Sequence, residues 1–149
     1  MTTSRLRDDI AALLAAQRLA VLATQDQNQP YTSLMAFAHT ADLSTIVAAT
    51  GQETRKHANI MAEARVSLLF DNRANSENDF TQAISLTAIG TATPLPVSSY
   101  PHYSALYLAK HPALRSFLES PSTVLLIIII ERYLMVDNFE HIREMIVTP

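Results

Sequence analysis

The run of apolar and β-branched residues from Thr123 to Val136 constrains the fold of this chain more than any other feature. Within it, Val124 to Ile130 is an unbroken apolar stretch of seven residues. Such a stretch favours a strand that is apolar on both faces, and an exposed strand of that kind would pair with other chains and aggregate. We therefore expect a bent or bulged strand here, with one face in a core. The other face needs a cover, either a helix or a second subunit.

Length and composition limit the classes of protein to consider. The 149 residues predict one domain over 1–149, and 48% hydrophobic with 17% charged residues is typical of a compact globule. A net charge of −3 without a basic run argues against nucleic-acid binding. The longest apolar run falls short of the about 20 residues that a membrane-spanning helix needs. The first residues show no signal-peptide pattern, so we expect a cytoplasmic protein.

Metal and thiol chemistry have little support in the sequence. The absence of cysteine excludes disulfides and thiol catalysis. No pair among the five histidines has the spacing of metal ligands, so no metal site is predicted. These histidines are His39, His57, His102, His111 and His141.

The remaining pattern indicates a mainly β protein. Three apolar segments joined by short polar turns predict an antiparallel meander, and two further segments follow. With the strand at 123–136 they make six strands, which favours a small, closed or partly closed antiparallel β-barrel with flanking helices. Gly90 inside the fifth segment marks a bulge or a close backbone approach. The five segments are 19–24, 31–38, 43–50, 66–70 and 83–92.

Helices are expected at four places. A first helix places four apolar residues on one face, and a second runs from Glu53 to Ala64 with a packing stripe of small and apolar residues. Pro101 and Pro112 each open a short helix, and the polar segment 71–79 reads as a loop. The apolar face of the first helix is Leu6, Ile10, Leu13 and Leu14, and the stripe of the second is Ala58, Met61 and Ala64.

The segment from Thr50 to Lys56 has the residues of a phosphate site. Gly51, one of two glycines in the chain, follows a strand and precedes a helix that begins with Thr54, Arg55 and Lys56. The free N–H groups of a first helical turn attract anions, and arginine can donate to two phosphate oxygens. The alternative is two solvated surface charges on an ordinary helix.

The order of these pieces resembles the FMN-binding split β-barrel family, the superfamily of pyridoxamine 5′-phosphate oxidase. The matching residues run from Leu6 to Thr91, and the last third matches in outline only. The matching motifs are Leu22-Ala23-Thr24, a turn ending at Pro30, the strand Tyr31 to Phe37, Ile46 to Thr50 followed by Thr54-Arg55-Lys56, the segment Ala64 to Leu69, and Gly90.

The resemblance implies a six-stranded, antiparallel, Greek-key-like split barrel that binds FMN at a homodimer interface. By this resemblance, three residues hold the FMN phosphate: Thr54, Arg55 and Lys56. The backbone of Thr32, Ser33, Leu34 and Met35 meets the edge of the flavin ring, and Ala49 and Thr50 line its other side. The implied function is a flavin-dependent oxidoreductase with a small-molecule electron donor or acceptor. No catalytic acid or base stands out.

Departures from the family pattern argue against the oxidase activity itself. The chain has no tryptophan, and it ends Arg143 to Pro149 where the oxidase is expected to carry Arg-Leu-x-Pro. The remaining basic residues form no paired cluster in the sequence, so we expect no turnover of pyridoxamine 5′-phosphate. They are Arg65, Arg73, Lys110, Arg115, Arg132 and Arg143, besides those of the first helix. Two alternatives stay open: a flavin-binding or redox-sensing protein without turnover, and the same barrel holding haem or a deazaflavin.

Overall fold

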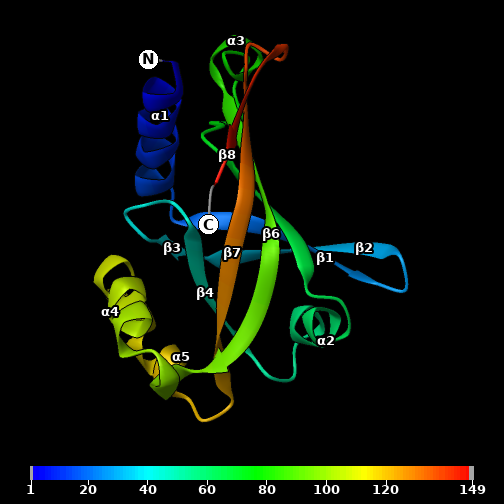
Figure 1. The fold of residues 1–149 in the computed structure, drawn as a ribbon, viewed down its shortest axis with the longest axis vertical. Helices are drawn as coiled ribbons and strands as arrows, with labels where there is room; N and C mark the ends of the chain where they lie inside the picture. Colours follow the sequence, from blue (N-terminus) through cyan, green and yellow to red (C-terminus); the bar gives the residue numbers. More distant parts are fainter. Residues whose placement is uncertain (1, 148–149) are drawn as a thin grey trace.

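A computed structural model describes residues 2–147 as one antiparallel sheet of eight strands flanked by helices (Figure 1). The strands are paired in the order β2-β1-β5-β6-β7-β4-β3, and β8 pairs with the free part of β7. The sheet curls until β2 contacts β4. The mainly β class with flanking helices is therefore confirmed. The strands are β1 (Leu19–Asp26), β2 (Gln29–Ala36), β3 (Ala38–His39), β4 (Thr45–Gly51), β5 (Arg65–Asp71), β6 (Ile84–Pro96), β7 (Thr123–Asp137) and β8 (His141–Ile146).

Two details of the expected strand arrangement are wrong. The described residues form eight strands instead of six, because the segment 31–38 divides at Phe37 and because His141–Ile146 returns along β7. The first three segments also form no meander, since β4 pairs with β7 and not with β2. β4 is buried along almost its whole length, and its neighbour β7 is the other strand with two covered faces. Two strands that are each covered on both faces belong in the middle of the structure, and β4 and β7 are paired there.

The two-sided apolar strand is covered within the chain. Alternate residues of β7 point into the barrel core, among them Leu126 and Ile128. Leu125 and Ile127 lie on the other face, in a second cluster with the apolar residues of two helices. These helices are α4 (Pro101–Lys110) and α5 (Arg115–Glu119), which begin close to the two prolines that predicted them. Of the two covers that the sequence left open, a helical one is present.

Gly90 occupies a close backbone approach, as its position in the strand predicted. The β6–β7 register shifts between Ile89 and Gly90, which is the mark of a β-bulge. A Cβ atom at Gly90 would overlap the carbonyl oxygen of Ile129. Only glycine fits this bulge without displacing β7.

The β1–β2 hairpin projects from the body of the sheet (Figure 1). Its two-residue turn, Gln27 and Asn28, has φ values of 49° and 69°. Positive φ at both turn residues is the geometry that matches the twist of an antiparallel hairpin. The turn therefore fixes the register in which Asp26 pairs with Gln29.

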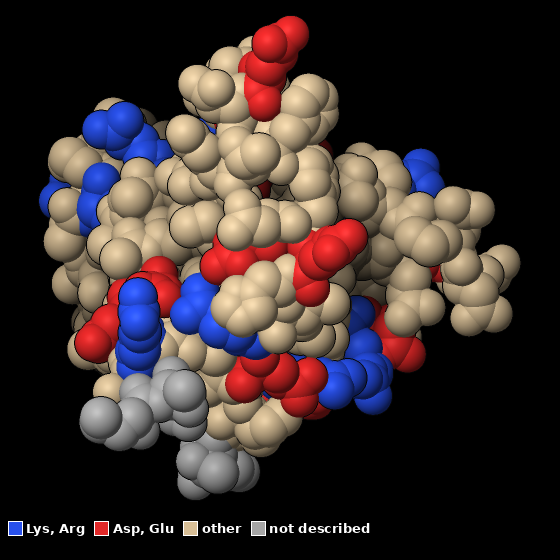
Figure 2. All heavy atoms as spheres, turned by 90° about the horizontal axis from the view of Figure 1, so that it is seen from above, with Lys and Arg blue, Asp and Glu red and all other residues tan. Residues whose placement is uncertain are grey.

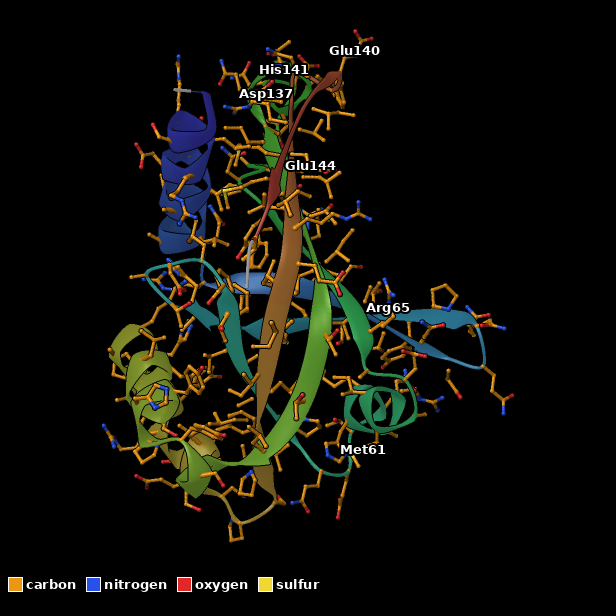
Figure 3. All side chains as sticks on the ribbon, in the orientation of Figure 1. Met61, Arg65, Asp137, Glu140, His141 and Glu144 are labelled. Atoms are coloured by element: carbon orange, nitrogen blue, oxygen red, sulfur yellow. The ribbon has the colours of Figure 1, made fainter. Side chains whose placement is uncertain are left out.

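The first helix packs as its spacing predicted, and the second does not. In α1 (Thr2–Ala16) the four apolar residues of the expected face are all buried. In α2 (Arg55–Ala62) the buried residues are Asn59 and Ile60, while Met61 is 67% exposed and lies away from the sheet (Figure 3). The expected stripe of Ala58, Met61 and Ala64 is wrong, because α2 begins two residues later and ends before Ala64.

The upper end of the molecule is held by charged contacts (Figures 1 and 3). Arg143 of β8 donates to Asp9 of α1 at 2.9 Å, and its other terminal nitrogen lies 3.5 Å from Asp137. His141 lies 2.9 Å from the same aspartate. A short helix that the sequence did not predict, α3 (Asp79–Gln82), ends the expected loop at 71–79. No helix of the described residues is long and apolar enough to cross a membrane.

Candidate functional site

Thr54 organises the turn between β4 and α2. It is the N-cap of α2, and its Oγ accepts a hydrogen bond from the backbone N–H of His57 at 3.3 Å. The same hydroxyl donates to the carbonyl of Gly51 at 3.0 Å and lies 2.8 Å from the hydroxyl of Thr50. Because the single Thr54 proton goes to Gly51, Thr50 is the donor of that pair. Three residues of the predicted phosphate segment thus share one network.

Arg55 follows this cap and carries an unpaired charge. Among the described residues, no carboxylate lies within 4.0 Å of its guanidinium, which sits 5.9 Å from the ring centroid of Tyr31. Arg55 is exposed, and the neighbouring Lys56 is partly buried. The first N–H groups of α2 have no acceptor inside the helix. An exposed arginine beside open N–H groups is the donor set that a phosphate group needs.

A cavity of about 420 Å³ lies at this helix start. Thr54 and Arg55 line it together with two carboxylates, Asp26 and Glu53, but Lys56 does not. Glu53 is exposed and borders the cavity. The two carboxylates lower the positive potential there, so an anion must approach from the side of the arginine and the helix N–H groups.

Sequence reasoning missed three residues of this region. Asp26 ends β1 at the hairpin turn, and Tyr31 lies on β2 opposite Thr24. Asn59 is buried, with its side-chain amide donating to Thr24 at 3.0 Å. The signal for Asn59 was its spacing of four from Arg55, which places both on one side of α2. Asp26 and Tyr31 were not accessible from spacing, because only the hairpin pairing brings them to α2.

The residues expected at the flavin ring lie along β2 and the end of β4. Thr32 and Leu34 are exposed, whereas Met35 is buried in the barrel core. The hydroxyl of Ser33 is buried without a hydrogen-bond partner. A buried hydroxyl without a partner costs about 1–3 kcal/mol, which a polar ligand atom would relieve.

On β4 the structure separates the two expected residues. Ala49 is 6% exposed and packs in the cluster beneath α4 and α5. Thr50 is 2% exposed and faces the opposite way, toward Thr54. The structure therefore brings Thr50, Thr54 and Arg55 together, and it leaves the side chain of Ala49 behind the helices.

The other polar groups of the described residues form no metal centre. No three of the described histidine and acidic side chains gather into a possible metal site. His111 is buried, with Nε2 at 2.7 Å from the carbonyl oxygen of Phe37. The pKa of His39 is lowered, mainly because the imidazole is partly buried and to a smaller extent because Lys110 carries a like charge nearby. On the face seen from above, basic and acidic side chains are interspersed (Figure 2).

A second group of cations appears that the sequence did not predict. Arg18, Arg73 and Lys110 line one cavity of about 1080 Å³, although they lie far apart in the chain. These basic residues are scattered in the sequence, as stated above, and only the fold brings them to one cavity. The chain fold brings together the end of α1, the end of β5 and the end of α4.

Comparison with known proteins decides the family. The sequence profile of the family described as "Pyridoxamine 5'-phosphate oxidase" matches residues 6–137. The chain belongs to this family. The resemblance stated from the sequence motifs is thereby confirmed. No curated protein sequence matches the chain.

Solved structures of other family-like proteins share the fold at low sequence identity. A heme-binding protein from Mycobacterium smegmatis has a TM-score of 0.81 at 13% identity, over 94% of this chain and 57% of that one. General Stress Protein 26 from Bacillus anthracis has a TM-score of 0.74 at 18% identity, over 96% and 99%. An FAD-binding protein from Mesorhizobium loti has a TM-score of 0.68 at 19% identity, over 85% and 91%. This chain thus spans little more than half of the mycobacterial protein. At these identities the likeness supports the split-barrel fold.

Proposed function

We propose that this protein binds FMN and acts as a flavin-dependent oxidoreductase other than pyridoxamine 5′-phosphate oxidase. The observation that carries the proposal is the capped start of α2, where the unpaired Arg55 stands beside open helix N–H groups. Family membership supports it, and so does the likeness to a protein described as FAD-binding. Bound flavin supplies hydride and electron transfer, and the protein supplies binding, orientation and exclusion of water.

Each proposed contact has a physical role. Arg55 and the N–H groups of α2 would hold the phosphate, and Lys56 would add a second positive charge. Thr54 fixes where the helix begins, so it positions these donors rather than supplying the main charge. The hydroxyl of Ser33 and the backbone of β2 would offer polar contacts to the ring edge. The buried Ala49 would contribute through its main chain only.

A homodimer with the flavin at its interface is part of the proposal, but the strand that first suggested it no longer supports it. β7 is covered by α4 and α5, so the support shifts to the apolar residues that stay exposed near the start of α2. Tyr31 of β2 and Met61 of α2 are 40% and 67% exposed. An obligate interface of about 2,000 Å² would cover such residues. Sedimentation as a stable monomer at low micromolar concentration would contradict the dimer.

The phosphate contacts are tested by comparing FMN with riboflavin, which lacks the phosphate. Charged hydrogen bonds to phosphate are worth about 1.5–3 kcal/mol each, so R55A/K56A should weaken FMN binding at least about tenfold. Riboflavin binding should be unchanged in that variant. R115A, which removes an exposed arginine at the distant helix α5, is the matched control. Equal affinity of the unaltered protein for FMN and riboflavin would refute the phosphate site.

The identity of the cofactor and the presence of turnover need separate measurements. An absorption spectrum with mass identification of the copurifying ligand distinguishes FMN from haem or a deazaflavin. Oxidation of NAD(P)H by the loaded protein distinguishes an enzyme from a flavin-binding or redox-sensing protein. Formation of pyridoxal 5′-phosphate at about 1 per second or faster would contradict the exclusion of the family's oxidase activity.

A further inference from the structure

The cavity lined by Arg18, Arg73 and Lys110 lies apart from the start of α2. Its volume is about 1080 Å³, and it shares no lining residue with the cavity at Thr54 and Arg55. The end of α1, the outer face of the β1–β2 hairpin and the end of α4 form its walls. This volume is at the upper end of the range, about 300–1,000 Å³, in which small-molecule sites occur.

Lys110 is the central charge of this cavity. Its ammonium donates to the carbonyl of Leu14, in the last turn of α1, at 2.9 Å, and it sits 3.8 Å from the ring centroid of Phe37. No carboxylate of the described residues lies within 4.0 Å of it. Burial first, and the charge of Arg18 second, lower the pKa of Lys110 to about 8. With one N–H on the Leu14 carbonyl and another side against the Phe37 ring, the ammonium keeps one N–H donor for a ligand.

The charge balance of the cavity favours an anion. Its one lining carboxylate among the described residues, Asp71, is bound to the guanidinium of Arg73 at 3.0 Å. Arg18 and Lys110 are therefore left without a counter-charge, close enough for the charge of Arg18 to lower the lysine pKa. The other titratable neighbours, His39 and His111, bring no negative charge. The repulsion between the exposed Arg18 and the partly buried Lys110 is relieved by a bound anion.

The rest of the lining is apolar. Aliphatic side chains from both hairpin strands, from β5 and from the segment after α4 face the cavity. A ligand that buries apolar surface here gains about 25 cal/mol per Å². The aliphatic residues are Leu19, Val21, Leu34, Ala36, Leu69 and Leu114.

We propose that this cavity binds a small carboxylate with an apolar body, its carboxylate at Arg18 and Lys110 and its body against the hairpin. A carboxylate suits the site because Arg73 is already neutralised by Asp71, which leaves Arg18 and Lys110, one for each carboxylate oxygen. Leu34 belongs both to this cavity and to the strand expected at the flavin ring. The carboxylate would therefore act on the flavin through this strand, as a modulator, a role that rests on the proposed function; the binding itself does not.

Calorimetric titration of the full-length protein, as purified and with added FMN, tests this assignment. The probes are benzoate and hexanoate, with benzyl alcohol as the neutral analogue and phenyl phosphate as the dianionic one. We expect benzoate to bind at least about tenfold more tightly than benzyl alcohol and phenyl phosphate. Affinity should fall as the pH rises through about 8, where Lys110 loses its proton. Tighter binding of phenyl phosphate, or no carboxylate binding, would overturn the proposal.

Variants separate this site from the flavin site. R18Q should weaken benzoate binding about tenfold without touching the core, because Arg18 is exposed. K110M should also weaken benzoate binding about tenfold. If K110M does not fold, because it loses the bond to the carbonyl of Leu14, R18Q alone tests the proposal. R132Q, an exposed arginine of β7, is the control that should bind normally. R55A/K56A should lose FMN and keep benzoate; the opposite result would move the carboxylate to α2. If the unaltered protein binds benzoate but does not bind FMN, only the proposed function fails.

Discussion

The network at the start of α2 predicts a measurable loss of stability when the Thr54 hydroxyl is removed. T54V replaces the hydroxyl with a methyl group of similar size, so little packing is lost. The substitution removes the N-cap acceptor for the N–H of His57, which is worth about 1 kcal/mol. It also leaves the hydroxyl of Thr50, a residue only 2% exposed, without its acceptor, at a cost of about 1–3 kcal/mol.

Together these terms predict a decrease of about 2–4 kcal/mol in the free energy of unfolding. Urea denaturation followed by circular dichroism measures it. For a chain of this size each kcal/mol lowers the melting temperature by about 2–4 °C, so we expect a decrease of roughly 4–16 °C. T54S keeps the hydroxyl and should stay within about 1 kcal/mol of the unaltered protein.

T81V is the matched control for this prediction. Thr81 is exposed in the short helix α3, and its hydroxyl makes one bond to a carbonyl at 3.3 Å. The same chemical change at that surface position should alter stability by no more than about 0.5 kcal/mol. If T54V proved as mild as T81V, the hydroxyl network would not be what fixes the start of α2. The positioning role of Thr54 would then be wrong.

Three further predictions concern the core and a surface turn. G90A should destabilise the protein by about 1–3 kcal/mol in urea unfolding, since the added methyl group overlaps the backbone of β7 at the bulge. Y133F should cost about 1–3 kcal/mol by the same measurement, because the buried Tyr133 hydroxyl donates to the carbonyl of Leu43 at 2.7 Å. Hydrogen bonds, first from the Thr40 hydroxyl, hold the pKa of Asp42 at about 2, below its ordinary 3.8. That stabilisation is present above the ordinary value and is lost as the pH falls through about 2, so D42N should be less stable than the unaltered protein at neutral pH and equal to it at the acid limit.

Local patterns in the sequence predicted the elements that depend on local chemistry. The apolar run of β7 and the two prolines, Pro101 at the start of α4 and Pro112 shortly before α5, were sufficient, because strand preference and a fixed φ act within a few residues. The cap at Thr54 was not predicted, and the expected start of α2 at Glu53 was two residues early. The glycine at the β6 bulge was also found, since a glycine within a strand signals close backbone approach.

Pairing between distant segments was not accessible in the same way. β4 pairs with β7, the other strand that is buried on both faces, and burial of this kind is visible only in the folded chain. β8 was not predicted because His141, Arg143 and Glu144 interrupt its apolar residues. Arg18, Arg73 and Lys110 lie at the ends of α1, β5 and α4, and these three ends come together beside the β1–β2 hairpin. No spacing rule contains that information, so the second cation group required the fold.

The β1–β2 hairpin joins the two proposed sites into one arrangement. Its tip carries Asp26 at the α2 cavity, and its base carries Leu19 and Ala36 at the cavity of Lys110. Between them lies Ser33, whose buried hydroxyl has no partner in the described structure. A flavin anchored by its phosphate at the tip would extend along this hairpin toward the base, where the carboxylate is proposed to bind. Because side chains alternate along a strand, Ser33 and Leu34 face opposite sides of the hairpin, so the two ligands would lie on opposite faces of one strand pair. The Gln27–Asn28 turn fixes which residues stand on each face, since a shift of one residue would exchange the two faces. A substitution in that turn that shifts the register should therefore weaken the binding of both FMN and benzoate in calorimetric titration.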